Sequence, residues 1–195
     1  MDLSLASWRQ QTAQLYLSDV DLAGFRAGRD AMFARHPQSP VDPAGFEGLP
    51  YFPASSFSCE CTLEPVDDDS TVEVDTGGED GVVTYRRLGR VATPWGGLTL
   101  LWIVAYGGGL FLPFRDGTSG KQTYGGGRYL TDTVKGTFGR GVTLTGDTTV
   151  RLDFDYAYNP SCAYDSRWAC PLPPVENWLD QPVEAGEMTS ATGPA

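Results

Sequence analysis

The chain has 195 residues, of which 41% are hydrophobic and 12% aromatic, so it can bury the core of one globular domain. Its formal net charge is −11 at pH 7. Nucleic-acid grooves need a basic face and anionic membranes attract basic segments, so the charge excludes both kinds of partner. The 24 glycines and 14 prolines predict many turns between short strands.

The N-terminus lacks a basic region followed by an apolar region, so it does not read as a signal peptide. No run of the sequence approaches the 18 or so apolar residues that a membrane-spanning helix needs. We therefore expect a soluble, acidic, cytoplasmic protein, in a compartment where disulfides are uncommon.

Residues 1–36 are expected to form a helical pair. Apolar side chains recur at helical spacing in residues 5–17 and again in residues 20–35, where Arg29 should lay its aliphatic stem along the apolar face. Ser18 and Asp19 are the expected N-cap of the second helix. His36, the only histidine, is better explained as a residue at a helix C-terminus than as a base or ligand, because it has no visible partner.

From residue 56 the pattern changes to short alternating strands, after a proline-rich connection that includes a short helix at residues 43–49. The expected strands cover residues 56–63, 71–75, 82–88, 98–106, 110–114 and 148–154. Asp67–Asp69 are expected to form a solvated turn, and residues 184–195 a flexible tail. The sequence thus predicts an α+β fold in one domain, residues 1–195. Its N-terminal helical pair packs on a mostly antiparallel β-barrel or β-sandwich, with the β-rich body in residues 56–183.

Two dense stretches stand out from this body. Residues 114–130 combine a polar turn with Gly125–Gly127, and three glycines in an extended segment suggest close approach of another backbone or a ligand. Pro113 just before them marks a strand end, an edge strand or a bulge. The stretch is not a phosphate-binding loop, because Gln122 follows Gly120-Lys121 where such a loop needs Ser or Thr.

Residues 155–177 form the second stretch, too rich in proline for regular structure yet full of Tyr, Trp and Cys. Long irregular segments with this much apolar area pack against something and are often functional.

The two stretches carry motifs that resemble a known family. The first is F-x-D-x-T-x-G-x-x-T-Y-G-x-G-R-Y-L, from Phe114 to Leu130, and the second is A-Y-N-P-x-C-A-Y followed by W-x-C-P-L-P-P-x-E-N, from Ala157 to Asn177. The chain is similar to bacterial and archaeal proteins of comparable length classed as a domain of unknown function. The resemblance implies that the motif residues are central to the family, and it implies no reaction. Asp155 departs from the Asn expected there, and Cys59 and Cys61 are peculiar to this chain.

Four cysteines permit a tetrahedral zinc site, but the spacings C-x-C and C-x7-C are not those of structural zinc sites, so we expect no metal and no cofactor. Cys59 and Cys61 would point to one face of a strand, as small core residues do. For Cys162 and Cys170 both free thiols and a disulfide stay open.

The main functional hypothesis is a pocket between loops 114–130 and 155–177 that binds a small polar or anionic ligand, with Arg128 offering a bidentate fork to an anion. The expected ligand-binding residues are Arg115, Asp116, Thr118, Tyr124, Arg128, Tyr129, Asn159, Tyr164 and Asn177. One alternative is an enzyme, such as a hydrolase, with catalytic residues drawn from Asp116, Tyr124, Arg128 and Cys162. Another is a structural or interaction domain whose loops lock each other, for example through Asp116 and Arg128.

Overall fold

Two amphipathic helices form the N-terminus, as the spacing of their apolar residues predicts. They are α1 (Ser4–Leu17) and α2 (Leu22–Arg35), seen in a computed structural model that describes residues 2–66, 70–78 and 81–189. The N-cap of α2 differs from the prediction. Asp21, not Ser18 or Asp19, accepts a hydrogen bond from the backbone N–H of Gly24 at 2.8 Å, which satisfies one of the free donors of the first turn.

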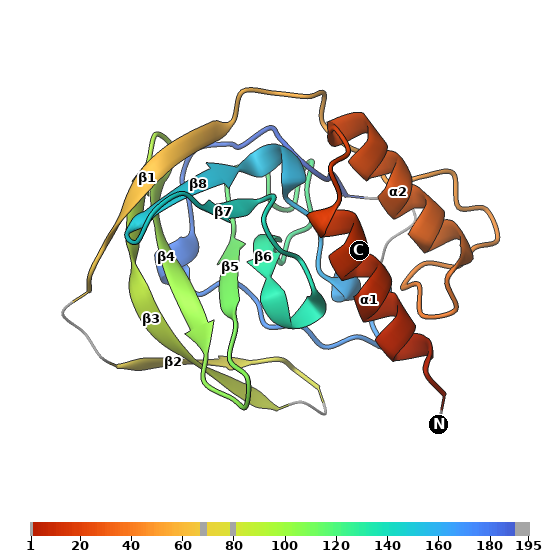
Figure 1. The fold of residues 1–195 in the computed structure, drawn as a ribbon, viewed down its shortest axis with the longest axis horizontal. Coiled ribbons are helices and arrows are strands. Elements are labelled where there is room, and N and C mark those ends of the chain that lie inside the picture. The colour runs from red at the N-terminus through yellow and green to blue at the C-terminus, as the bar shows by residue number, and fades with distance from the viewer. Residues whose placement is uncertain (1, 67–69, 79–80, 190–195) are drawn as a thin grey trace.

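After the helices, the strands of the described chain form one antiparallel sheet. This sheet curls into a nearly closed barrel (Figure 1). The strands are β1 (Ser58–Glu64), β2 (Thr71–Asp75), β3 (Val82–Thr93), β4 (Gly96–Ile103), β5 (Leu110–Phe114), β6 (Arg128–Asp132), β7 (Val142–Leu144) and β8 (Thr149–Asp153). Their order is β6-β5-β4-β3-β1-β8-β7, with β2 paired to β3. The predicted α+β class is confirmed, and the body is a barrel.

The two ends of the sheet meet beside β6. Tyr129 in β6 exchanges backbone hydrogen bonds of 2.9 and 3.0 Å with Tyr158, which follows β8. Gly141, just before β7, lies against Leu130 so closely that a Cβ atom at position 141 would be 2.2 Å from the Leu130 carbonyl oxygen. Only glycine permits this approach, which covers an edge that would otherwise be open.

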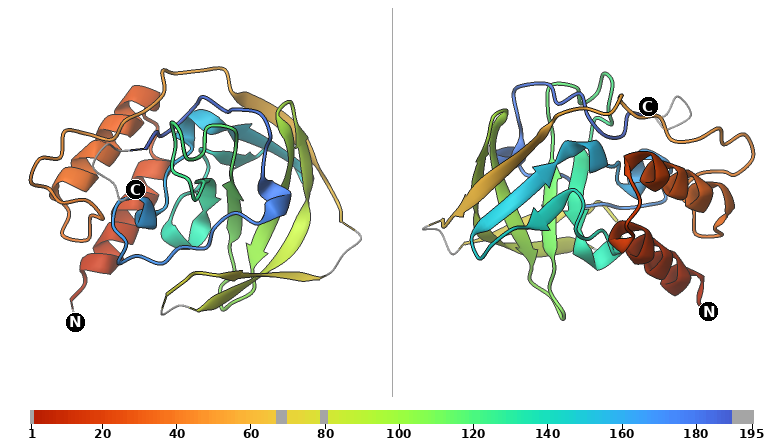
Figure 2. Two further views of the ribbon diagram at one scale, coloured as in Figure 1. Left: turned by 180° about the vertical axis from the view of Figure 1, so that it is seen from behind. Right: turned by 45° about the horizontal axis from the view of Figure 1, so that its top comes forward.

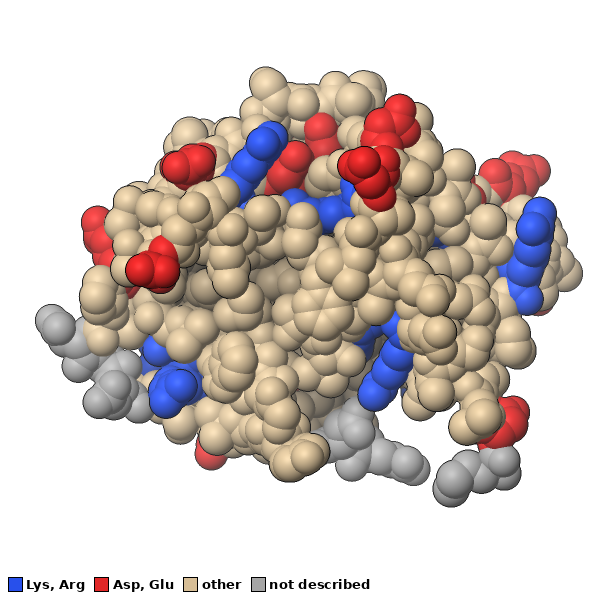
Figure 3. All heavy atoms as spheres, in the orientation of Figure 1, with Lys and Arg blue, Asp and Glu red and all other residues tan. Residues whose placement is uncertain are grey.

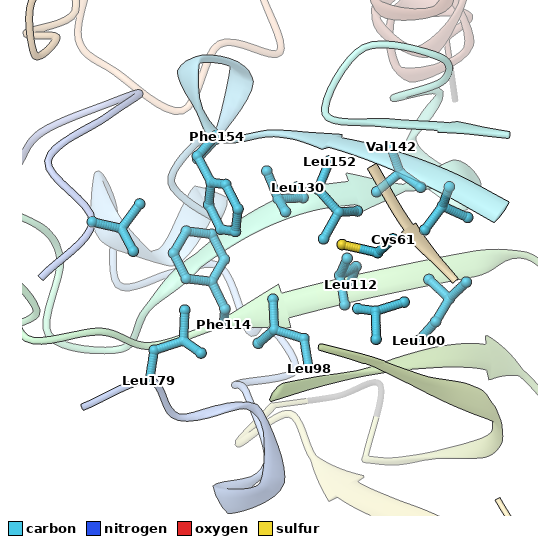
Figure 4. Close-up of a cluster of buried hydrophobic side chains, with 14 of the residues drawn as sticks. Cys61, Leu98, Leu100, Leu112, Phe114, Leu130, Val142, Leu152, Phe154 and Leu179 are labelled. Atoms are coloured by element: carbon cyan, nitrogen blue, oxygen red, sulfur yellow. The ribbon is translucent and has the colours of Figure 1, made fainter. Parts of the chain in front are cut away.

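The barrel interior is filled by alternate residues of the strands, as the sequence pattern predicts. In β8, Val150 and Leu152 are buried, and Phe154 follows them into the core. Figure 4 shows Phe154 beside Phe114, and the two rings meet edge to face with centroids 5.2 Å apart.

A second cluster lies outside the barrel, under the helices. It consists of buried aromatic and aliphatic side chains from α1, α2, β3 to β6 and the segment after β8: Tyr16, Phe25, Tyr85, Leu101, Phe111, Tyr129 and Tyr158. Figure 2 shows the helical pair beside the barrel. Because β6 has the barrel core on one face and this cluster on the other, all five of its residues are buried.

The pairing of β5 with β6 shifts register beside Pro113, for which a strand end, an edge strand or a bulge was expected. Leu112 faces Thr131 and Pro113 faces Tyr129, so the extra residue of this bulge is Leu130 in β6. β5 pairs with β4 at only two residues. Beyond them, hydrogen bonds of the Asn177 side chain join the two strands in place of backbone hydrogen bonds. Its Nδ2 donates to the carbonyl oxygens of Thr99 (3.0 Å) and Pro113 (2.8 Å), and its Oδ1 accepts from the N–H of Thr99 at 2.7 Å. The buried backbone groups at the bulge are thereby satisfied.

Two further expectations are wrong. Residues 43–45 form a bend and a turn and residues 46–49 have no regular structure, instead of a short helix. Gly45 and Gly48 have positive φ, which a right-handed helix does not allow. Residues 184–189 are not a frayed tail, because Ala185 and Glu187 are fully buried. Asp67–Asp69 and residues 190–195 lie outside the described residues. No helix among the described residues is long and apolar enough to cross a membrane.

Candidate functional site

A small cavity of about 70 Å³ lies between the helical pair and the segment after β8. Its wall is mainly apolar, with polar groups from α2, the residues after β6, and the loop at 158–164. The lining residues used below are Trp8, Thr12, Arg29, Lys135, Asn159 and Tyr164. Charged side chains lie mostly around the rim of the face seen in Figure 3, and the centre of that face is largely uncharged.

A buried ion pair adjoins this cavity. Nη1 of Arg29, on α2, donates to Glu187 Oε2 at 2.8 Å and to the Tyr51 hydroxyl at 2.9 Å. Burial, the largest single effect, lowers the pKa of Arg29, but the Glu187 carboxylate and three nearby tyrosine hydroxyls together outweigh it, so the pKa lies well above its ordinary value and the guanidinium stays charged. The charge of Arg29 is therefore already neutralised inside the protein.

The same carboxylate organises the loop at 158–164. Glu187 accepts hydrogen bonds from the Tyr164 hydroxyl, from the Asn159 N–H at 3.1 Å and from Asn159 Nδ2 at 3.2 Å. Nδ2 also donates to the Met188 carbonyl oxygen at 2.9 Å, which fixes the orientation of the amide. Burial raises the pKa of Tyr164 well above its ordinary value, so its hydroxyl stays protonated as a donor.

Asn159 Oδ1 is the polar atom of this site that stays unpaired. It is buried and accepts no hydrogen bond from any residue that the structure describes. Buried polar atoms nearly always have a partner, so an unpaired acceptor on a residue that lines a cavity is a candidate contact for a small donor.

A wider pocket of about 390 Å³ opens where the two dense stretches of the sequence meet. Its lining combines Tyr124 from the first stretch with Cys162, Trp168 and Cys170 from the second. The Tyr124 hydroxyl donates to Cys162 Sγ at 3.7 Å. Burial raises the pKa of Tyr124 to about 12, so the phenol is protonated at neutral pH.

Asp116 and Arg128 line neither space. Arg128 Nη2 lies 2.6 Å from Asp116 Oδ2, with both side chains 1% exposed. The guanidinium also donates to the carbonyl oxygens of Val183, Ala185 and Glu187. Arg128 therefore ties β6 to the C-terminal segment. Its pairing with Asp116 is the one expected for the alternative of a structural domain whose loops lock each other.

Four other predicted site residues also contact the protein itself. Thr118 donates to Asp116 at 2.5 Å, and the Tyr129 hydroxyl donates to the Pro171 carbonyl oxygen. Arg115 stacks its guanidinium 4.5 Å from the centre of the Trp178 ring. Asn177 bridges β4 and β5, as described above. Of the expected ligand-binding residues, only Asn159 and Tyr164 line the small cavity, and only Tyr124 lines the wider pocket.

The sequence reasoning missed Arg29 and Glu187 as site residues. An arginine on an otherwise apolar helix face was a usable signal, since a buried guanidinium needs an acidic partner. Glu187 gave no such signal, because it stands in a segment with no regular structure.

The fold and these two spaces define a class: a nearly closed antiparallel barrel with an N-terminal helical pair and pockets between its loops. Residues 44–188 match the family described as "Protein of unknown function (DUF1684)", and the chain belongs to that family. It is also similar to the solution NMR structure of an uncharacterized protein from Haloarcula marismortui, with 32% identity and a TM-score of 0.59, over 97% of this chain and 98% of that one. None of the curated proteins matches the chain.

Proposed function

We propose that the protein binds a small uncharged polar ligand in the cavity between the helical pair and the loop at 158–164. The observation that carries this proposal is the buried Oδ1 of Asn159, which has no donor among the described residues and belongs to a residue lining a mostly apolar cavity. The ligand would have an apolar part and a hydroxyl or amide donor.

The charges beside the cavity favour an uncharged ligand over an anion. Arg29 is paired with Glu187 at 2.8 Å, and Lys135 lies 3.6 Å from Asp132. An anion would have to compete with the Glu187 and Asp132 carboxylates for Arg29 and Lys135. A neutral donor needs only an acceptor, which Asn159 Oδ1 supplies. The volume of about 70 Å³ limits the ligand to a few heavy atoms, because pockets for larger molecules measure roughly 300 Å³ or more.

In this proposal Asn159 and Tyr164 remain ligand-site residues, and Arg115, Asp116, Thr118, Arg128, Tyr129 and Asn177 serve the fold. The acidic net charge of −11 continues to disfavour a nucleic-acid partner. The cytoplasmic location remains a prediction from the sequence.

A thermal-shift screen tests the proposal, using small alcohols and amides and, as matched compounds, carboxylates with the same carbon skeleton. A ligand at 100 times its Kd adds about 2.7 kcal/mol to the free energy of unfolding. We expect the alcohols or amides to raise Tm and the carboxylates to leave it unchanged. Thr12→Phe, which fills the cavity from α1, should abolish the shift, and Gln14→Phe, at an exposed position of the same helix, should keep it. Equal shifts from carboxylates, or a shift that survives Thr12→Phe, would refute the proposal.

A further inference from the structure

The wider pocket holds two thiols that belong to different parts of one irregular loop. Cys162 lies in the short 3-10 helix Ser161–Ala163, and Cys170 precedes Pro171. Both are free cysteines and both line the pocket, where Cys170 is buried and Cys162 half-buried, and each thiol shifts the pKa of the other. The pair is thus in contact and open to a small reagent from one side.

The surroundings of the two sulfurs differ. Cys170 faces the backbone N–H groups of Ser161 and Cys162 and the positive charge of Lys135, while Cys162 accepts from the Tyr124 hydroxyl at 3.7 Å. The hydrogen bond from Cys162 lowers the pKa of Cys170 to about 6; burial opposes it, and Lys135 and the two N–H groups reinforce it. The same hydrogen bond, followed by burial, raises the pKa of Cys162. At neutral pH the pair therefore holds one thiolate, at Cys170, and one thiol, at Cys162.

We propose that Cys162 and Cys170 form a redox-active dithiol that a hydroperoxide oxidises to a disulfide. The Cys170 thiolate attacks the terminal oxygen of the hydroperoxide, the O–O bond breaks, and an alcohol leaves after its oxygen takes a proton from solvent. Cys170 is then a sulfenic acid. Cys162 attacks this sulfur, the S–S bond forms, the S–O bond breaks, and the hydroxide leaves as water with the proton of Cys162. The two thiols lose two electrons in total, and these reduce the O–O bond.

The loop between the two cysteines can close this bond. A disulfide needs the sulfurs about 2.05 Å apart, and two thiols that line the same pocket from one irregular segment can approach by a movement of that segment alone. Trp168, in the same loop, has a buried Nε1 that donates to none of the residues that the structure describes, and it also lines the pocket.

The chain contains its own control pair. Cys59 and Cys61 also have sulfurs in contact, at 3.3 Å, but they project from β1, where Cys61 is part of the barrel core. Burial raises the pKa of Cys59 to about 12, so Cys59 is a thiol at neutral pH. If two neighbouring sulfurs were enough for reactivity, both pairs would be oxidised. The proposal expects oxidation of Cys162 and Cys170 first.

The test is a titration of the full chain with hydrogen peroxide at pH 7, followed by alkylation of the remaining thiols and peptide mass mapping. We expect the wild type and Cys59→Ser/Cys61→Ser to form the Cys162–Cys170 disulfide at rates equal within about twofold, and a thiol reductant to reverse it. Cys162→Ser should stop at a sulfenic acid on Cys170 that dimedone traps, and Cys170→Ser should slow oxidation of Cys162 at least about tenfold, as the thiolate is the reactive form.

A second measurement on the wild type keeps the test valid if a variant fails to fold. The rate at which iodoacetamide alkylates Cys170 should rise with a midpoint near pH 6 in the native protein and near the ordinary thiol value, about 8.5, in urea. Oxidation of Cys59 and Cys61 before the other pair would overturn the proposal. So would a Cys170→Ser protein oxidised at the wild-type rate, or a native midpoint equal to that in urea.

Discussion

The guanidinium of Arg29, on the second helix, lies 2.8 Å from the carboxylate of Glu187, 158 positions further along the chain. This ion pair joins the helical pair to the C-terminal segment, and the same carboxylate holds Tyr164 and Asn159 beside the cavity. One buried acid therefore supports both the packing of the helices and the shape of the candidate ligand site.

Replacing Glu187 by Gln should destabilise the protein strongly. The change leaves Arg29 as a buried charge without a counter-ion, a loss of about 3–5 kcal/mol in the free energy of unfolding. Urea unfolding followed by tryptophan fluorescence measures it. Glu184→Gln, at an exposed position three residues earlier, is the matched control and should stay within about 0.5 kcal/mol of the wild type. A similar small effect for both variants would show that the ion pair does not hold the helices.

Arg128→Ala is expected to be a folding mutation. It removes the partner of Asp116 and leaves the carbonyl oxygens of Val183 and Ala185 without their buried donor, so we expect a loss of about 3–5 kcal/mol. Arg115→Ala removes an arginine of the same stretch that only stacks on Trp178, and should cost about 1 kcal/mol or less. Urea unfolding compares the two. If Arg128→Ala unfolds at the wild-type urea concentration, Arg128 is not the clamp that its contacts indicate.

The local features of this fold could be predicted from the sequence, because each has a local cause. Alternation placed Val150 and Leu152 inside the barrel, and Pro113 marked an irregularity that turns out to be a bulge in the facing strand β6. The roles of polar residues could not be predicted in the same way. Asp116, Arg128 and Asn177 have the composition of a ligand site, and the sequence left open whether Asp116 and Arg128 instead pair with each other, as they do. Arg128 and Asn177 also bind backbone groups 55 or more positions away in the chain, and no local pattern encodes such pairings.

The candidate site shows the same limit. The two dense stretches do meet, and they form the pocket of Tyr124 and Cys162. The small cavity, by contrast, depends on helix residues such as Trp8 and on Glu187 from a segment that reads as a tail. A buried acid in an irregular segment has neither periodicity nor turn chemistry to indicate its burial.

Asn177→Ala should weaken the junction between β4 and β5. The side chain satisfies the carbonyl oxygens of Thr99 and Pro113 and the N–H of Thr99, and each buried group left without a partner costs about 1–3 kcal/mol. We expect faster amide hydrogen exchange at Thr99 and a lower Tm. Val175→Ala, two residues away and 73% exposed, should change neither. Unchanged protection of the Thr99 amide in Asn177→Ala would contradict this role.

Asp132 should make the stability of the protein depend on pH. It is 4% exposed, its Oδ2 lies 3.6 Å from Lys135, and its Oδ1 has no hydrogen-bond partner among the described residues. Burial raises the pKa of Asp132, and Lys135 only partly opposes this. An acid whose pKa is raised by folding binds its proton more tightly in the native state. Its contribution to stability is therefore present below the unfolded pKa, about 3.9, and is lost as pH rises through the higher native pKa.

The variant Asp132→Asn, which is uncharged and nearly the same shape, removes this dependence. It should be more stable than the wild type at pH 7, and the difference should shrink as pH falls through the native pKa towards about 3.9. Lys135 loses its partner in the variant, but its side chain is 39% exposed and water replaces the carboxylate at little cost. Urea unfolding at a series of pH values measures the difference, with Asp147→Asn, at an exposed position, as the control for the chemical change itself. An Asp132→Asn protein that is less stable than the wild type at pH 7, by an amount that does not change with pH, would show that the buried carboxylate stabilises the fold in its ionised form.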